Sequence, residues 1–385
     1  MLYILIFIIF IFSFIFIIDA ILKFQIWQSR IKIGKFKNKP DWKKSVKEKS
    51  KQWLKKSPTI KLTDNDRFVV ADMLRGSYRK DAIQYWQEAA LILGLSDDYK
   101  STSDPEIKKE IENYIKSKID ATGNWKKAIT ETDAVILAYA FIQLDWVDHH
   151  RLKPAYDTLW KMLQDLTGED GTVSYKKHTY RYRYVDTIGF ICPFLIEYGQ
   201  KFNIPEAVDL GIKQIEEFNK YGMLKDEFIP CHTYVVDSKF PAGLFGWGRG
   251  LGWYAIGLID SWNVLNDAHE KKNEMQEWVL RFAKVCMQFQ RENGSWGWLV
   301  TQSSSRPDSS ATATLAWFLK NAAKIEEISE ISEQASEKAM DYLMTVTRRS
   351  GAVDFSQGDT KGIGIYSTHF DILPFTQGFC LRTLS

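Results

Sequence analysis

The sequence predicts an all-α protein in which six helical hairpins close into an (α/α)6 toroid, preceded by an N-terminal transmembrane helix. The first observation is that uniformly apolar helical stretches, which belong inside, alternate with amphipathic charged stretches, which belong outside. The second is that the apolar stretches recur every 53 to 67 residues, as expected of repeated helical hairpins. An open helical solenoid is the alternative architecture.

The N-terminus carries a long apolar run. From Leu2 to Ile18 only Ser13 is not apolar, and with Asp19 tolerated the run continues to Leu22. As a helix it would be about 31 Å long, at roughly 1.5 Å per residue, which spans a bilayer. A cleaved signal peptide is the rival, but no basic residue precedes the run and no small-x-small site follows it. We therefore expect residues 1–22 to form a single-pass transmembrane anchor.

Residues 23–57 are predicted to be a basic linker, because residues 23–56 hold 13 Lys or Arg against Asp41 and Glu48. By the positive-inside rule this flank stays in the cytoplasm, so we expect a cytoplasmic domain, with export as the alternative. The linker would contact anionic membrane lipids or remain simply solvated. Because the chain as a whole is only +3, the rest of it is acidic, and no nucleic-acid partner is expected.

Residues 58–385 are predicted to form one domain built from alternating inner and outer helices. Gly-containing turns such as Gly123-Asn124-Trp125 and Asn293-Gly294-Ser295-Trp296 separate the hairpins. The inner helices are expected to begin near Asp81, Asp133, Asp186, Arg249, Ser309 and Thr376, and the clearest outer helices span Glu106–Ile119, Glu206–Lys220, Glu274–Gln290 and Ser329–Thr345.

Several classes of site have no support in the sequence. The four cysteines are widely separated and have no His at ligand spacing, so neither a metal site nor a disulfide framework is expected. No Walker loop, dinucleotide fingerprint or Gly-x-Ser-x-Gly elbow is present. We therefore predict no cofactor and no metal.

The stretch Gly246–Tyr254 combines two indoles, a guanidinium and four glycines in nine residues. Glycines let the backbone approach a ligand, Trp247 and Trp253 could stack on sugar rings, and Arg249 offers a planar fork for a carboxylate. The sequence therefore favours an acidic oligosaccharide as ligand. The alternatives are that this is a tight loop before an aromatic-rich helix, that the indoles belong to the core, and that Arg249 forms an internal salt bridge.

Two acids precede apolar helices in the same local context. Asp186 follows Tyr184-Val185, and Asp133 lies 53 residues earlier, before Ala134-Val135. In a toroid the starts of the inner helices meet at one rim, so acids far apart in the sequence can converge there. Asp186 is thus the leading catalytic candidate and Asp133 the second. The alternative is that each acid only caps its helix.

Three motifs together resemble the unsaturated uronyl and rhamnogalacturonyl hydrolases of glycoside hydrolase families 88 and 105. The resemblance covers about residues 60–385, and its motifs are Val185-Asp186-Thr187, Trp247-Gly248-Arg249-Gly250-x-Gly252-Trp253-Tyr254 and Asp308-Ser309-Ser310-Ala311. It implies an (α/α)6 catalytic domain that removes a Δ4,5-unsaturated uronic acid from the non-reducing end of an oligosaccharide by hydrating its vinyl ether.

The resemblance also implies roles for single residues. Asp186 matches the family's acid/base and Asp133 its second acid, while His232 and Arg249 match residues that contact substrate. The C-terminal segments Lys361–Gly364 and Pro374–Gly378 depart from the family's usual ending. The N-terminal anchor is a second departure from the family's pattern.

Two other functions remain open at this stage. One is a membrane-anchored glycosidase that uses Asp186 and Asp133 as acid and base on an intact polysaccharide or a lipid-linked glycan. The other is an inactive carbohydrate-binding protein, which would keep its glycan affinity after loss of Asp186.

Overall fold

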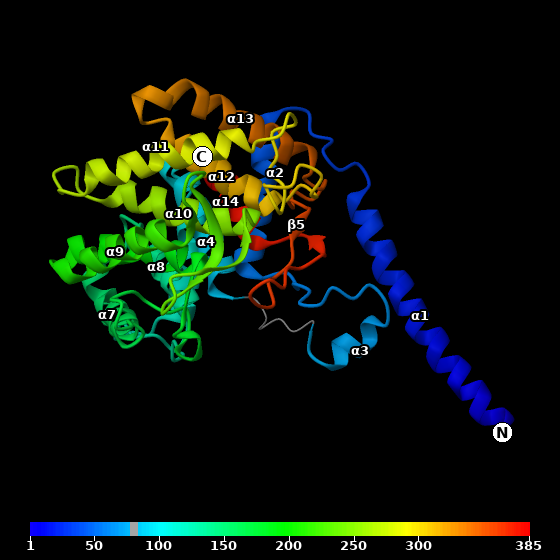
Figure 1. The fold of residues 1–385 in the computed structure, drawn as a ribbon. Coiled ribbons are helices and arrows are strands. Elements are labelled where there is room, and N and C mark those ends of the chain that lie inside the picture. The colour runs from blue at the N-terminus through cyan, green and yellow to red at the C-terminus, as the bar shows by residue number, and fades with distance from the viewer. Residues whose placement is uncertain (78–83) are drawn as a thin grey trace.

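The computed structural model describes residues 1–77 and 84–385, and this part of the chain is mostly helical (Figure 1). Consecutive inner helices pack against one another, and α14 at the C-terminus packs against α4, so the ring closes. Closure excludes the open solenoid and agrees with the predicted toroid. The start expected at Asp81 lies outside the described residues. The inner helices are α4 (Tyr85–Thr102), α6 (Val135–Ile142), α8 (Val185–Phe202), α10 (Gly248–Val264), α12 (Ser309–Ala322) and α14 (Pro374–Leu384).

Amphipathic helices surround this ring and each turns its apolar face inward. Their partners are almost wholly apolar inner helices, which explains why the two kinds of sequence alternate. Four of the outer helices coincide closely with the predicted ones. The outer helices are α2 (Lys39–Lys55), α5 (Pro105–Lys118), α7 (His149–Asp165), α9 (Pro205–Tyr221), α11 (Lys272–Gln288) and α13 (Ser329–Thr345).

Helix α2 differs from the expectation of a basic linker over residues 23–57. Its residues Trp42 and Val46 are fully buried, and the helix packs against α14, α4 and α5. The high lysine content hid an apolar face, because most of the lysines lie toward solvent and pair with acids, as Lys39 does with Asp341 and Lys55 with Glu106. The toroid therefore includes residues on the N-terminal side of the expected boundary at 58.

Helix α1 (Leu2–Arg30) also runs further than the expected anchor of residues 1–22, and Figure 1 shows it projecting from the body of the molecule. Among the described residues it is the one helix long and apolar enough to cross a membrane. Its part from Asp19 onward lies against the domain, and Asp19 accepts hydrogen bonds from the amides of Phe68 and Val69 at the start of α3 (Val69–Leu74).

Glycines of the inner helices allow close helix packing. A Cβ on Gly189 would lie 2.7 Å from the Trp253 carbonyl oxygen, and one on Gly257 would lie 2.6 Å from the Ile188 backbone. These contacts join α8 to α10. The glycine-rich stretch that was expected to let the backbone approach a ligand is instead the first half of α10, and its glycines serve packing between helices.

Short antiparallel strands lie at one end of the ring, so the all-α description holds for the toroid itself and not for its loops. The central strand β3 (Ile229–Val235) pairs with β1 (Tyr182–Tyr184), β2 (Met223–Leu224) and β4 (Pro241–Phe245). A separate pair joins β5 (Ser356–Gln357) to β6 (Phe370–Asp371).

Candidate active site

The sheet around β3 brings three distant segments together. β1 leads directly into α8, which carries Asp186, β3 carries His232, and β4 leads into Trp247 at the start of α10. Pairing fixes their register, with Tyr184 opposite Thr233 and Phe245 opposite Cys231. Side chains from these three segments therefore converge at one rim of the toroid.

A cavity of about 270 Å³ at this rim is lined by five of the six predicted site residues. Asp133 lies elsewhere, in the wall of a neighbouring cavity of about 680 Å³, and Gln84 lines both cavities. The structure thus groups most of the predicted site but places its second acid in an adjoining pocket. The five residues are Asp186, His232, Trp247, Arg249 and Trp253.

Asp186 lies in the first turn of α8 and does not cap it, since Tyr184 occupies the cap position. Its side chain is 18% exposed, its Oδ2 has no hydrogen-bond partner, and that atom lies 3.8 Å from His232 Nε2. Burial raises the pKa of Asp186 to about 7, with Asp359 adding to the rise and Arg249 opposing it. A substantial fraction of Asp186 is therefore protonated at neutral pH.

The hydrogen bonds around His232 are compatible with a ring proton on Nε2. The amide of Leu244 donates to Tyr366 Oη at 3.1 Å, and Tyr366 Oη lies 3.1 Å from His232 Nδ1. When the Tyr366 hydroxyl donates to Nδ1, the ring proton is on Nε2, the nitrogen that faces Asp186. Burial lowers the pKa of His232 to about 4, so the ring is neutral.

Arg249 is buried, and its hydrogen bonds go to the chain that follows β5. Its Nη1 donates to the carbonyl of Gln357 at 2.5 Å, and its Nη2 donates to the carbonyl of Gly358 at 2.8 Å and to Thr360 Oγ1 at 3.1 Å. It forms no ion pair with Asp186 or Asp133 among the described residues. The alternative that Arg249 forms an internal salt bridge to one of these acids is therefore not seen there, and the guanidinium orders residues 357–360.

The two indoles form part of the buried floor. Trp247 is 1% exposed, donates from Nε1 to Gln357 Oε1 at 2.9 Å, and packs against His232. Trp253 is 2% exposed and packs edge-on against Phe190. Only small parts of either ring are free for a sugar, which agrees with the alternative that they belong to the core.

Asp133 lies in a short 3-10 turn (Thr132–Ala134) that leads into α6. Burial raises its pKa to about 7, Glu131 adds to the rise, and Lys176 and the amides of Tyr85 and Ala134 oppose it. Burial raises the pKa of Tyr175, and the charges of both Asp186 and Asp133 add to the rise, so its hydroxyl is within electrostatic reach of both acids.

The segment between β5 and β6 supplies pocket residues that the sequence analysis did not select. Asp359, Thr360 and Lys361 line the cavity with Asp186, and burial raises the pKa of Asp359. Asp359 is also the carboxyl group that raises the pKa of Asp186. The glycines on either side, in Gly358-Asp359-Thr360-Lys361-Gly362, were the available signal for a loop near a ligand.

Asp308, from the third motif, has a structural role. It is fully buried, caps α12 through the amide of Ser310, and accepts a hydrogen bond from the amide of Gln357 at 3.0 Å. It therefore helps to fix the same segment that Arg249 orders. Among the described residues, no group of three or more His, Cys, Asp or Glu side chains is arranged to hold a metal ion.

A closed ring of helical hairpins, with a protonatable carboxyl group among aromatic side chains at its rim, defines a carbohydrate-processing enzyme of the (α/α)6 class. The chain belongs to Glycosyl Hydrolase Family 88, whose family model matches residues 47–381. The resemblance inferred from the three motifs is thereby confirmed, and the protein is a glycoside hydrolase.

Solved structures share this fold at low sequence identity. A possible member of glycoside hydrolase family 105 from Salmonella enterica serovar Paratyphi A is 16% identical with a TM-score of 0.74, over 91% of this chain and 94% of that chain. An unsaturated glucuronyl hydrolase responsible for the degradation of glycosaminoglycan, from Bacillus sp. GL1, is 16% identical with a TM-score of 0.66, over 88% and 94%. One specific for heparin is 15% identical with a TM-score of 0.66, over 89% and 96%. No curated protein sequence matches this chain.

Proposed function

We propose that the enzyme removes a Δ4,5-unsaturated uronic acid from the non-reducing end of an acidic oligosaccharide by hydrating its vinyl ether. The observation that carries the proposal is Asp186, whose buried Oδ2 has no partner and whose pKa of about 7 keeps it partly protonated. Hydration of a vinyl ether needs one group that gives a proton and later accepts one. The family and its unsaturated glucuronyl hydrolase members support the same reaction.

In the proposed reaction, Asp186 donates its proton to C4 of the unsaturated sugar. The C4–C5 π electrons form the new C–H bond, and the resulting cation at C5 is stabilised by the ring oxygen. A water molecule adds to C5 and returns a proton to the Asp186 carboxylate. The hemiketal then opens and releases the next sugar. The Nε2–H of His232 faces Asp186 and would stabilise its carboxylate between these steps.

Asp133 and Asp359 are the candidates for a second carboxyl group. Asp133 is the residue that matches the family's second acid, and Asp359 is the one that shares the cavity with Asp186. The substrate's own carboxylate needs a cationic partner. Arg249 supplies positive charge at the cavity wall, and Lys176 and Lys361 line the same cavity with flexible ammonium groups.

We also propose that α1 anchors the enzyme in a membrane as a single pass. Its apolar part is almost wholly exposed in the isolated chain, which suits a lipid environment. The lysines that follow the apolar run and precede α2 would contact anionic headgroups, and by the positive-inside rule they place the domain in the cytoplasm. They are Lys23, Lys32, Lys35 and Lys37. The orientation can be tested with a C-terminal reporter that is active only when it is exported. Activity of this reporter would contradict a cytoplasmic domain.

The test is to incubate the full-length enzyme in detergent with lyase-generated unsaturated disaccharides and to follow loss of the ultraviolet absorbance of the conjugated enol. The matched saturated disaccharides serve as controls. Loss of absorbance with release of the second sugar is the expected result. Cleavage of the saturated sugars would instead indicate a glycosidase acting on intact glycans, and binding without any product would indicate a carbohydrate-binding protein.

A further inference from the structure

We propose that Arg30, the last residue of α1, is a positioning residue for the active site. It ties the helix that is proposed to cross the membrane to the segment that walls the catalytic cavity, residues 354–371. The catalytic part of this inference rests on the proposed function, whereas the ordering of the segment can be measured without any substrate.

The contacts of Arg30 are those of a built site. Its Nε and Nη2 donate to the two carboxylate oxygens of Asp354 at 2.8 and 2.9 Å, and Nη2 also donates to the carbonyl of Phe370 at 3.2 Å. Its guanidinium lies 4.6 Å from the ring centroid of Phe355. Asp354 is fully buried. Such a bidentate pair fixes orientation as well as distance, and a single ammonium group cannot reproduce it.

A continuous set of hydrogen bonds leads from Arg30 to the cavity. Asp354 lies two residues before β5, and Phe370 is the first residue of β6. Within this strand pair Gln357 lies opposite Phe370. Gln357 accepts from Trp247 Nε1 through its side chain and from Arg249 through its carbonyl. The next residues, from Asp359 to Lys361, line the cavity. Arg30 therefore fixes the two ends of the segment through Asp354 and Phe370. Arg249 fixes its middle, beside the catalytic cavity.

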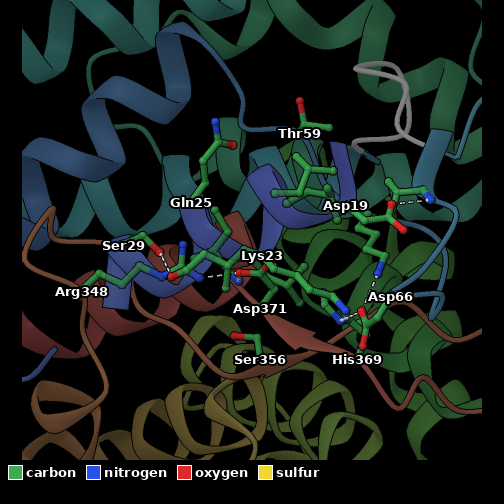
Figure 2. A pocket seen from close by; sticks show the side chains of 18 of the residues that line it. Asp19, Lys23, Gln25, Ser29, Thr59, Asp66, Arg348, Ser356, His369 and Asp371 are labelled. Carbon is green, nitrogen blue, oxygen red and sulfur yellow. Dashed lines mark hydrogen bonds and ion pairs between the residues drawn. The ribbon is translucent and has the colours of Figure 1, made fainter. Parts of the chain in front are cut away.

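Among the described residues, side-chain hydrogen bonds tie helix α1 to the domain at two points. Asp19 caps α3 and Arg30 binds Asp354, and about 16 Å of helix separates them at 1.5 Å per residue. Between the two points lies a cavity of about 720 Å³ (Figure 2). Figure 2 shows α1 residues facing it, with residues of the domain on the opposite wall. The labelled α1 residues are Asp19, Lys23, Gln25 and Ser29, and those of the domain include Thr59, Asp66, Arg348 and Asp371.

This geometry gives Arg30 its particular importance. Across the cavity, α1 is not packed tightly onto the domain, so its position near the active site depends on the Arg30 contacts. Arg348 also binds Asp354, at 2.6 Å, and Asp371, at 2.6 Å, which keeps the domain end of the segment folded when Arg30 is replaced. Loss of Arg30 should therefore loosen the segment without unfolding the toroid.

The experiment compares Arg30→Gln, Arg30→Lys and Lys39→Gln in the full-length protein in lipid nanodiscs. Lys39 is the matched control, because it forms exposed ion pairs with Glu337 and Asp341 away from the active site. For Arg30→Gln we expect amide exchange of residues 356–371 to be about ten-fold faster, as for loss of a charged hydrogen bond. KM for the unsaturated disaccharide should rise by a similar factor, with Arg30→Lys intermediate and Lys39→Gln unchanged.

The outcomes separate this inference from the proposed function. Exchange of residues 356–371 that equals wild type in Arg30→Gln overturns the inference. With an active wild type, an unchanged KM also overturns it, because a merely structural role would lower the yield of folded protein and leave the KM of the folded fraction unaltered. A wild type without activity on any unsaturated disaccharide contradicts the proposed function alone, and faster exchange would still support the role of Arg30.

Discussion

Asp186 and Asp133 have the same local setting but different pockets. Each lies at the start of an inner helix, and burial raises the pKa of each to about 7. Asp186 faces His232 and shares its cavity with Asp359, whereas Asp133 lines the adjoining cavity with Glu131. The comparison teaches that similar acidity does not imply a similar role. What distinguishes Asp186 is an oxygen without a partner beside a neutral imidazole.

The largest expected effect is that of Asp186→Asn. Without a group that can give and accept a proton, kcat should fall about 10³- to 10⁴-fold, the upper part of the range for general acid–base catalysis. The amide keeps nearly the same shape, so substrate affinity should be retained. Turnover is followed by ultraviolet absorbance and binding by calorimetry. Turnover within ten-fold of wild type would show that Asp186 is not the acid.

Asp133→Asn should have a smaller effect, about 10²-fold in kcat/KM, because the residue would position water or substrate and not transfer the proton. Steady-state kinetics on the same disaccharide will separate kcat from KM. If Asp133→Asn lowers kcat as much as Asp186→Asn does while substrate binding is unchanged, the two acids act as a pair. The difference between their pockets would then not correspond to a difference in role.

Asp359→Asn tests the electrostatic neighbourhood of Asp186. The Asp359 charge raises the pKa of Asp186, so its removal should lower that pKa. Since the proposed mechanism needs protonated Asp186, activity falls as pH rises through about 7, and in the variant this fall should begin at lower pH. The measurement is the pH profile of kcat/KM. Asp267→Asn, at a side chain that is 96% exposed, is the control and should leave the profile unchanged.

The smallest expected effect concerns stability. The folded-state pKa of Asp186 lies above its unfolded value, so its stabilising contribution is complete below about pH 4 and is lost as pH rises through about 7. The free energy of unfolding of Asp186→Asn, measured in urea, should therefore gain about 1 kcal/mol or more relative to wild type between pH 5 and pH 8. Asp133→Asn should gain a similar amount, because burial raises its pKa to the same value. A gain in only one of the two variants would show that the two pockets bury their acids differently.

Much of the ring could be predicted from the sequence because its inner helices are apolar on every side. Such helices must lie inside, and their spacing gives the number of hairpins. Helix α2 escaped detection because its buried residues, among them Trp42 and Val46, are set among many lysines. Net charge describes a whole segment, whereas burial depends on one face of it.

The candidate site was predicted less completely. Asp186 was found through its Val-Asp-Thr motif and His232 through its position ahead of the Trp-Gly-Arg segment, and the structure places them together. Arg249 was expected to bind the substrate, but the sequence does not reveal that carbonyls more than 100 residues away take its hydrogen bonds. Asp359 was missed for the same reason. Its proximity to Asp186 follows from ring closure and from no local pattern.

The closing contact between α14 and the start of the toroid has a consequence for synthesis. Gln377 donates to the carbonyls of Val46 and Gly351, and the amide of Phe375 donates to the side-chain oxygen of Gln87. A chain emerging from the ribosome therefore completes α2 and α4 long before their final partner exists. Their apolar faces stay uncovered until α14, the last helix, of eleven residues, is available, so folding finishes only after the C-terminus is released. Premature termination by even these few residues would leave an open, aggregation-prone ring.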